Sequence, residues 1–166
     1  MPHLHNLPHL RKGRARQASS YDRRGGNKDF ITLDPGETAT LMNTTGAGRI
    51  ERIWFTTQDW PDPDRFKVKR EHILRKLLFR AYWDGEDNPS IDCPLGDFFG
   101  AGFGRYEEYH SLVMGMTSGG FFCYFPMPYS DGCRIELTNE SDEKISHFYY
   151  AFNYLALDQL EEDVGR

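Results

Sequence analysis

Apolar and polar residues alternate along several short segments of the chain, with the period of two that is typical of half-buried β-strands. The clearest case is 49–57, where Ile50, Arg52, Trp54 and Thr56 fall on one face of a predicted strand and 51, 53 and 55 on the other. The predicted strands are 38–42, 49–57, 77–83, 121–125, 133–138 and 145–157.

Turn signals separate these strands at short intervals. Pro35-Gly36, Gly119-Gly120, the 130–132 SDG segment and the 139–142 NESD segment are all rich in turn-forming residues. Many short strands joined by such turns predict an all-β fold, an antiparallel β-sandwich with a single jelly roll. We expect a basic lead segment at 1–20 and one jelly-roll domain at 21–166.

The apolar residues of the 71–83 segment fit both the helical and the strand periodicity. Between 71 and 83 the apolar residues Ile73, Leu74, Leu77 and Leu78 also fit a helical stripe, and from Leu77 onward the strand pattern is favoured. A polar connection at 61–70 precedes this segment.

Composition agrees with one globular domain, since 166 residues with 39% hydrophobic residues can bury a sizeable core. An apolar run of the ~20 residues that cross a bilayer does not occur. The amino terminus lacks the apolar core of a signal peptide. From the sequence we therefore expect a cytoplasmic protein without a membrane partner.

Charge is distributed unevenly. Residues 1–28 hold seven basic side chains and one acid, a balance of +6 that leaves −11 for the remainder. Such an arm can neutralise phosphates, but aromatic residues that would stack on bases do not interleave with its basic residues before Tyr21. We favour an arm that docks on an acidic surface of its own or a neighbouring subunit, and we do not expect nucleic acid as a partner.

Acids and aromatics gather at 82–100. Asp84 and Glu86 are two residues apart, beside Trp83, and Asp97 follows shortly after. Paired carboxylates are the groups that glycoside hydrolysis requires, which makes these three weak catalytic candidates. The same Asp-Gly segment is also an ordinary hairpin turn.

The 19–29 segment is a second polar concentration. Tyr21, Asp22, Arg23 and Asn27 supply donors and acceptors that suit vicinal hydroxyls, and a strained turn explains them equally well. Together with Trp83, Asp84, Glu86 and Asp97 they are the predicted substrate-binding residues.

Metal and cofactor chemistry find little support in the sequence. His3, His5 and His9 have no nearby carboxylate or cysteine, so we expect no metal site. The glycine-rich segment at 96–104 is not followed by a helix and does not form a nucleotide loop, so we expect no cofactor. The cysteines Cys93, Cys123 and Cys133 are an odd count, which we interpret as structural or free thiols.

Taken in order, five segments resemble the amino-terminal jelly roll of glycoside hydrolase family 172, also known as domain of unknown function 2961. They are 20–27 (SYDRRGGN), 46–56 (GAGRIERIWFT), 82–90 (YWDGEDNPS), 95–100 (LGDFFG) and 124–128 (YFPMP). The resemblance implies a jelly roll, assembly into trimers or hexamers, and retaining hydrolysis or transfer at fructofuranosyl or arabinofuranosyl linkages. It also implies kinship with capsid proteins.

The chain departs from the family in ending after one jelly roll, whereas family members carry two and place their catalytic glutamates in the missing half. We therefore expect a furanosidase-like protein that lacks those glutamates, or one that works with a partner chain carrying a second jelly roll. In the first hypothesis, with a carbohydrate ligand, the predicted site residues converge on one cleft. The alternative is a non-catalytic homo-oligomeric jelly roll, capsid-like or carbohydrate-binding.

Overall fold

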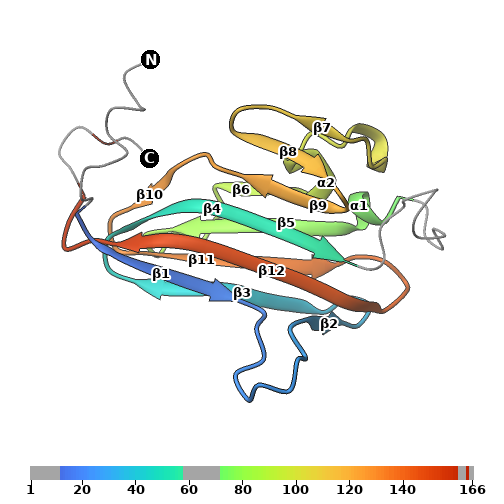
Figure 1. Ribbon diagram of the computed structural model, residues 1–166, viewed down its shortest axis with the longest axis horizontal. Coiled ribbons are helices and arrows are strands. Elements are labelled where there is room, and N and C mark those ends of the chain that lie inside the picture. Colours follow the sequence, from blue (N-terminus) through green and yellow to red (C-terminus); the bar gives the residue numbers. More distant parts are fainter. Residues whose placement is uncertain (1–11, 58–71, 161–163, 165–166) are drawn as a thin grey trace.

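Two antiparallel β-sheets packed face to face form the protein in the computed structural model, which describes residues 12–57, 72–160 and 164 (Figure 1). The larger sheet has the order β1 (Arg14–Ser19), β12 (Ile145–Ala156), β4 (Gly48–Thr57), β9 (Gly120–Cys123), β8 (Met114–Thr117), β7 (Tyr109–His110). Two short strands join it, β2 (Ile31–Leu33) beside β12 and β10 (Met127–Tyr129) beside β4. The smaller sheet has the order β3 (Thr38–Thr45), β11 (Gly132–Asn139), β5 (Leu77–Trp83), β6 (Ile91–Pro94).

The strand pairings nest within one another. β1 pairs with β12, β3 with β11, β4 with β9, and β5 with β6. This is the order produced when one long hairpin is rolled into two sheets, so the predicted jelly roll is confirmed. In Figure 1 the blue β1 and the red β12 lie side by side along the front of the sandwich.

An aromatic cluster joins the two sheets. The ring of Phe55 on β4 lies 5.4–5.8 Å from those of Phe79, Phe99, Phe148 and Phe152. All five residues are fully buried. Burying each such side chain contributes about 1.5–3 kcal/mol, so this cluster is a main source of the sandwich's stability.

The predicted alternation along β4 is wrong at one point. Ile50 was expected on the face opposite Ile53 and Phe55, but all three are buried. The pairing with β12 skips Glu51, because Asn153 lies opposite Arg52 and Tyr154 opposite Ile50. This β-bulge changes the phase of the strand and directs Ile50 into the core.

The 71–83 segment changes from helix to strand at Leu77, as predicted. Ile73–Lys76 forms the short helix α1 and Leu77 begins β5. Two further short helices follow β6, α2 (Leu95–Phe98) and the 3-10 helix η2 (Gly102–Gly104). No helix in the described part of the chain is long and apolar enough to span a bilayer.

The structure adds a strand inside the expected lead segment. Arg14–Ser19 forms β1 and pairs along β12, although its sequence did not predict a strand. Residues 1–11, with three of the histidines, and the polar 61–70 connection lie outside the described residues. The three cysteines are free thiols, as predicted.

Candidate functional site

Asp84 directly follows β5 and supports a turn of the backbone. Its Oδ1 accepts hydrogen bonds from the backbone N–H groups of Ser130 (2.7 Å) and Asp131 (2.6 Å). Its own N–H donates to the carbonyl of Gly132 at 2.8 Å. The carboxylate therefore holds the connection between β10 and β11 to the end of β5, which is a structural task.

The neighbours of Asp84 also have structural contacts. Trp83 is half-buried, and its ring stacks on that of Tyr129, with centroids 6.5 Å apart. Glu86 is exposed and accepts a hydrogen bond from the hydroxyl of Ser90 at 3.2 Å. Glu86 also lines a small cavity of about 360 Å³, in which the guanidinium of Arg134 lies 3.8 Å from the Tyr82 ring centroid.

The 21–29 loop is organised by Asp22. Its carboxylate accepts hydrogen bonds from the N–H groups of Arg24 (2.9 Å), Gly26 (3.0 Å) and Lys28 (3.3 Å). The bonds from Arg24 and Lys28 hold the pKa of Asp22 below its ordinary value of 3.8. Because the carboxylate is engaged with its own loop, the strained-turn interpretation describes Asp22 best.

The other predicted residues of this loop are exposed. Asn27 has a backbone φ of 60°, in the left-handed region that asparagine tolerates. Tyr21 is 56% exposed, and the Arg23 guanidinium lies 5.9 Å from its ring centroid.

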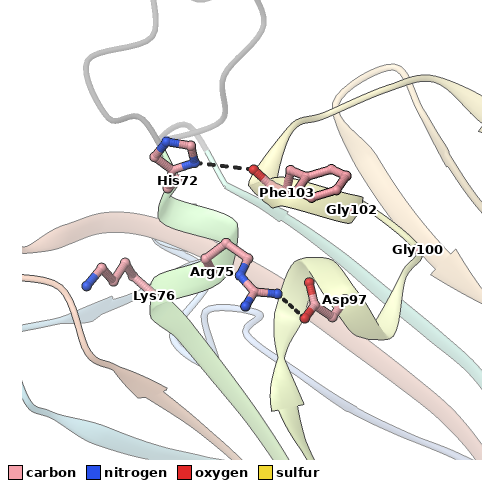
Figure 2. Close-up of a pocket in the computed structure, with 7 residues that line it drawn as sticks. All are labelled: His72, Arg75, Lys76, Asp97, Gly100, Gly102 and Phe103. Carbon is pink, nitrogen blue, oxygen red and sulfur yellow. Dashed lines mark hydrogen bonds and ion pairs between the residues drawn. The ribbon is translucent and has the colours of Figure 1, made fainter.

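Asp97 does not line the cavity that contains Glu86, but a second, larger one. Residues of α1, α2 and the loop around η2 line this space of about 790 Å³, which we call the Asp97 cavity (Figure 2). The lining residues are His72, Arg75, Lys76, Asp97, Gly100, Gly102 and Phe103.

Two contacts organise this cavity. Arg75 on α1 forms an ion pair with Asp97 on α2, and the two side chains are 46% and 34% exposed. The ring of His72 lies within hydrogen-bonding distance of the Phe103 carbonyl oxygen, 3.2 Å from Nδ1 (Figure 2). An ion pair this exposed stabilises a fold by at most about 1 kcal/mol. Its main effect is to orient both charged groups at the cavity.

Two residues that line this cavity have a left-handed backbone conformation. His72 and Phe103 have φ angles of 65° and 61°. Histidine tolerates this left-handed region better than most residues, whereas a bulky residue such as phenylalanine rarely occupies it. Phe103 is 87% exposed, so burial of its ring does not compensate for the strain. Strain of about 1–3 kcal/mol that packing does not explain is typical of functional positions.

Gly104 allows the loop to approach α1. Its φ is 68°, and a Cβ atom at this position would lie 2.8 Å from Cγ of Arg75 and 3.3 Å from Cα of His72. A side chain would therefore push the η2 loop away from α1. The glycine after Phe103 is what places the phenyl ring beside the cavity.

The surroundings of Cys93, which include Asp97, disfavour its thiolate form. Burial raises the pKa of Cys93, and the charges of Asp97 and Asp92 raise it further. Cys93 therefore stays protonated at neutral pH. Within the described ranges 12–57 and 72–160, groups of acidic, cysteine or histidine side chains that could hold a metal ion do not occur.

The predicted site residues do not converge within one chain. Asp84 follows the last residue of β5, whereas Asp97 follows β6, whose Pro94 pairs with Leu78 at the start of β5. At about 3.3 Å per residue the two carboxylates lie roughly 20 Å apart. A retaining glycosidase needs its pair about 5–5.5 Å apart, so Asp84 and Asp97 do not form one.

Asp97 was among the predicted site residues, whereas the residues that line the cavity with it were not. His72 had no partner in the sequence because Phe103 is 31 residues away. The glycine-rich 96–104 segment is the signal in the sequence that indicates close turns near Asp97. Its glycines allow the turns that bring Asp97 and Phe103 to α1.

Comparison with known proteins gives one family. The model of a family described as GH172 domain-like matches residues 25–151. The match covers most of the jelly roll, including both cavities. Among curated proteins, none matches the chain.

Proposed function

Because the chain belongs to the GH172 domain-like family, we propose that it acts on carbohydrates with furanosyl linkages, fructofuranosyl or arabinofuranosyl, and binds them in the Asp97 cavity. The family match supports a glycoside-hydrolase-like protein, and the furanosyl specificity is our proposal. A cavity of about 790 Å³ has the size of small-molecule sites, roughly 300–1,000 Å³.

The observation that carries this proposal is that the exposed Phe103 lines the same cavity as the Arg75–Asp97 pair. An aromatic ring offers a flat apolar surface to the C–H face of a sugar, while a carboxylate and a guanidinium offer acceptors and donors to its hydroxyls. The strained backbone at Phe103 is then the cost of holding that ring at the cavity.

We further propose that this jelly roll binds the sugar without supplying the catalytic carboxylate pair. Asp84 is bound to the β10–β11 connection and Asp97 to Arg75. The nucleophile and the general acid would come from another segment or from a partner chain with a second jelly roll. Asp97 would orient the substrate.

The test measures binding and turnover separately, with arabinofuranosyl and fructofuranosyl disaccharides and their pyranosyl counterparts. We expect the chain alone to bind furanosides without hydrolysing them, and Phe103→Ala to weaken binding about fivefold or more, since a stacked ring contributes of order 1 kcal/mol. Phe125→Ala is the matched control, because Phe125 is also exposed (47%) and does not line the cavity.

Two results would contradict this proposal. Equal affinity of the Phe103→Ala and Phe125→Ala variants for the sugar would show that the sugar does not bind in the Asp97 cavity. If the chain alone hydrolyses the sugar and the Glu86→Gln variant does not, the 82–86 segment has a catalytic role.

A second candidate function, assembly without catalysis, is favoured by an apolar area on the outer surface. Leu112 is 93% exposed and Tyr124 46% exposed. The Tyr124 N–H donates to the Val113 carbonyl at 2.7 Å, which brings the two segments together. We call Leu112, Tyr124 and the adjoining rings of His110 and Phe122 the outer apolar patch.

A further inference from the structure

The Asp97 cavity carries more basic than acidic groups. Arg75 and Lys76 oppose the single acid Asp97, and His72 adds an imidazole. The chain as a whole has a net charge of −5, so a basic cavity is not what its composition alone would produce. The local excess of positive charge therefore indicates a preference for anions at this site.

The basic groups are not all neutralised by the protein. The ion pair with Asp97 engages one nitrogen of the Arg75 guanidinium, which carries five N–H donors. Lys76 makes no hydrogen bond or ion pair through its side chain within the residues that the structure describes, and in Figure 2 its side chain extends away from Asp97. Both residues thus keep donors for a ligand.

The contact between His72 and Phe103 indicates which ring nitrogen of His72 carries the proton. A carbonyl oxygen only accepts hydrogen bonds, so the contact with Phe103 requires that Nδ1 of His72 carries the proton. In the neutral ring Nε2 is then an acceptor, which suits a sugar hydroxyl. Beside this imidazole, the cavity combines the Phe103 side chain with the cationic groups of Arg75 and Lys76.

From these features we infer that the cavity takes a furanosyl sugar that bears an anionic group, a phosphate or a carboxylate. The sugar lies against Phe103, and the anion is bound by Arg75 with Lys76 contributing charge. This inference rests on the proposed furanoside binding and adds the charge of the ligand.

The experiment is calorimetric titration of the full chain with four sugars and with inorganic phosphate. Fructose 6-phosphate closes only as a furanose, since its 6-hydroxyl is blocked, and methyl fructofuranoside is its neutral counterpart. Methyl arabinofuranosiduronate tests a carboxylate, and glucose 6-phosphate tests a phosphorylated pyranose. We expect at least one anionic furanoside to bind about tenfold tighter than the neutral one at low salt, with the advantage decreasing as salt rises.

Lys76→Gln is the diagnostic variant, since its side chain has no structural contact to lose in the described residues. It should lower the affinity for the anionic furanoside about threefold or more, and by a larger factor than the affinity for the neutral ligand. Lys12→Gln is the matched control, because Lys12 is exposed next to β1, away from the cavity, and should change neither affinity.

The outcomes separate this inference from the proposed function. If methyl fructofuranoside binds as tightly as both anionic furanosides, the inference is overturned and furanoside binding stands. If glucose 6-phosphate binds as tightly as fructose 6-phosphate, the anion preference stands and the furanosyl specificity falls. If inorganic phosphate alone matches fructose 6-phosphate, the sugar contributes nothing and the inference is overturned.

Discussion

Two aspartates of similar sequence context have different tasks at the residue scale. Asp84 and Asp97 are each followed within a few residues by glycine. Asp84 accepts two backbone N–H groups of the β10–β11 connection, whereas Asp97 faces a cavity and meets Arg75. The difference lies in the partners that the fold brings to each carboxylate, and it separates a structural residue from a candidate site residue.

Substitution of Asp84 tests this distinction. Asp84→Ala should lower the free energy of unfolding by about 1–2 kcal/mol, because two N–H groups lose a charged acceptor. Asp84→Asn should cost less, since it keeps an acceptor oxygen and tolerates the φ of 55°. Urea unfolding measures both variants, with the exposed Asp87→Ala as control. A loss of sugar affinity without a loss of stability would instead assign Asp84 to binding.

Short elements, rather than the long strands, build the candidate site at the element scale. α1 and α2 have four residues each, and η2 has three. They lie at the end of the sandwich where β5 starts and β6 ends, and the strands hold them in place. The long strands supply stability, and the connections between them supply the chemistry, as is common in β-sandwiches.

β1 offers a test of how far the domain extends. A chain that starts at Tyr21 loses β1 (Arg14–Ser19) and leaves the edge of β12 that paired with it, residues 151–156, without a partner strand. Exposed strand edges associate with one another, so we expect lower thermal stability and concentration-dependent aggregation in light scattering. A chain that starts at Lys12 keeps β1 and is the control. Equal stability of the two truncations would make β1 a dispensable arm.

At the scale of the whole molecule, the outer apolar patch is a surface to which the proposed sugar binding assigns no task. Strand alternation directs Phe121 into the core and Phe122 outward, where Tyr124 and His110 cover it. Exposed apolar side chains on neighbouring segments, here Leu112 and Tyr124, are typical of interaction surfaces. We propose that copies of the chain associate through this patch, as trimers or hexamers.

Light scattering and sedimentation test the assembly. Leu112→Asp combined with Tyr124→Ser should convert an oligomer to a monomer, because charge and lost apolar area oppose burial of the patch. Phe103→Ser, at another exposed aromatic residue, should leave the assembly unchanged. A wild-type monomer at tens of micromolar would contradict the proposal.

Much of the fold could be predicted from local patterns. The strands at 38–42, 133–138 and 145–157 follow from alternation and turns, and each lies within an observed strand except for the last residue, Leu157. β1 was missed because an edge strand rich in basic residues has little apolar alternation to reveal it. The burial of Ile50 was not predicted, because the β-bulge that turns it toward the core depends on the pairing with β12.

The sequence by itself determined the β class, the turns and the family, since these rest on local residue preferences and on the order of motifs. Only the tertiary structure decided which polar residues meet. It brings His72 and Arg75 to Phe103 and Asp97, and it holds Asp84 at the other end of β5. Such contacts join positions far apart in the chain, and strand register and glycine-dependent turns set them, which a local pattern does not encode.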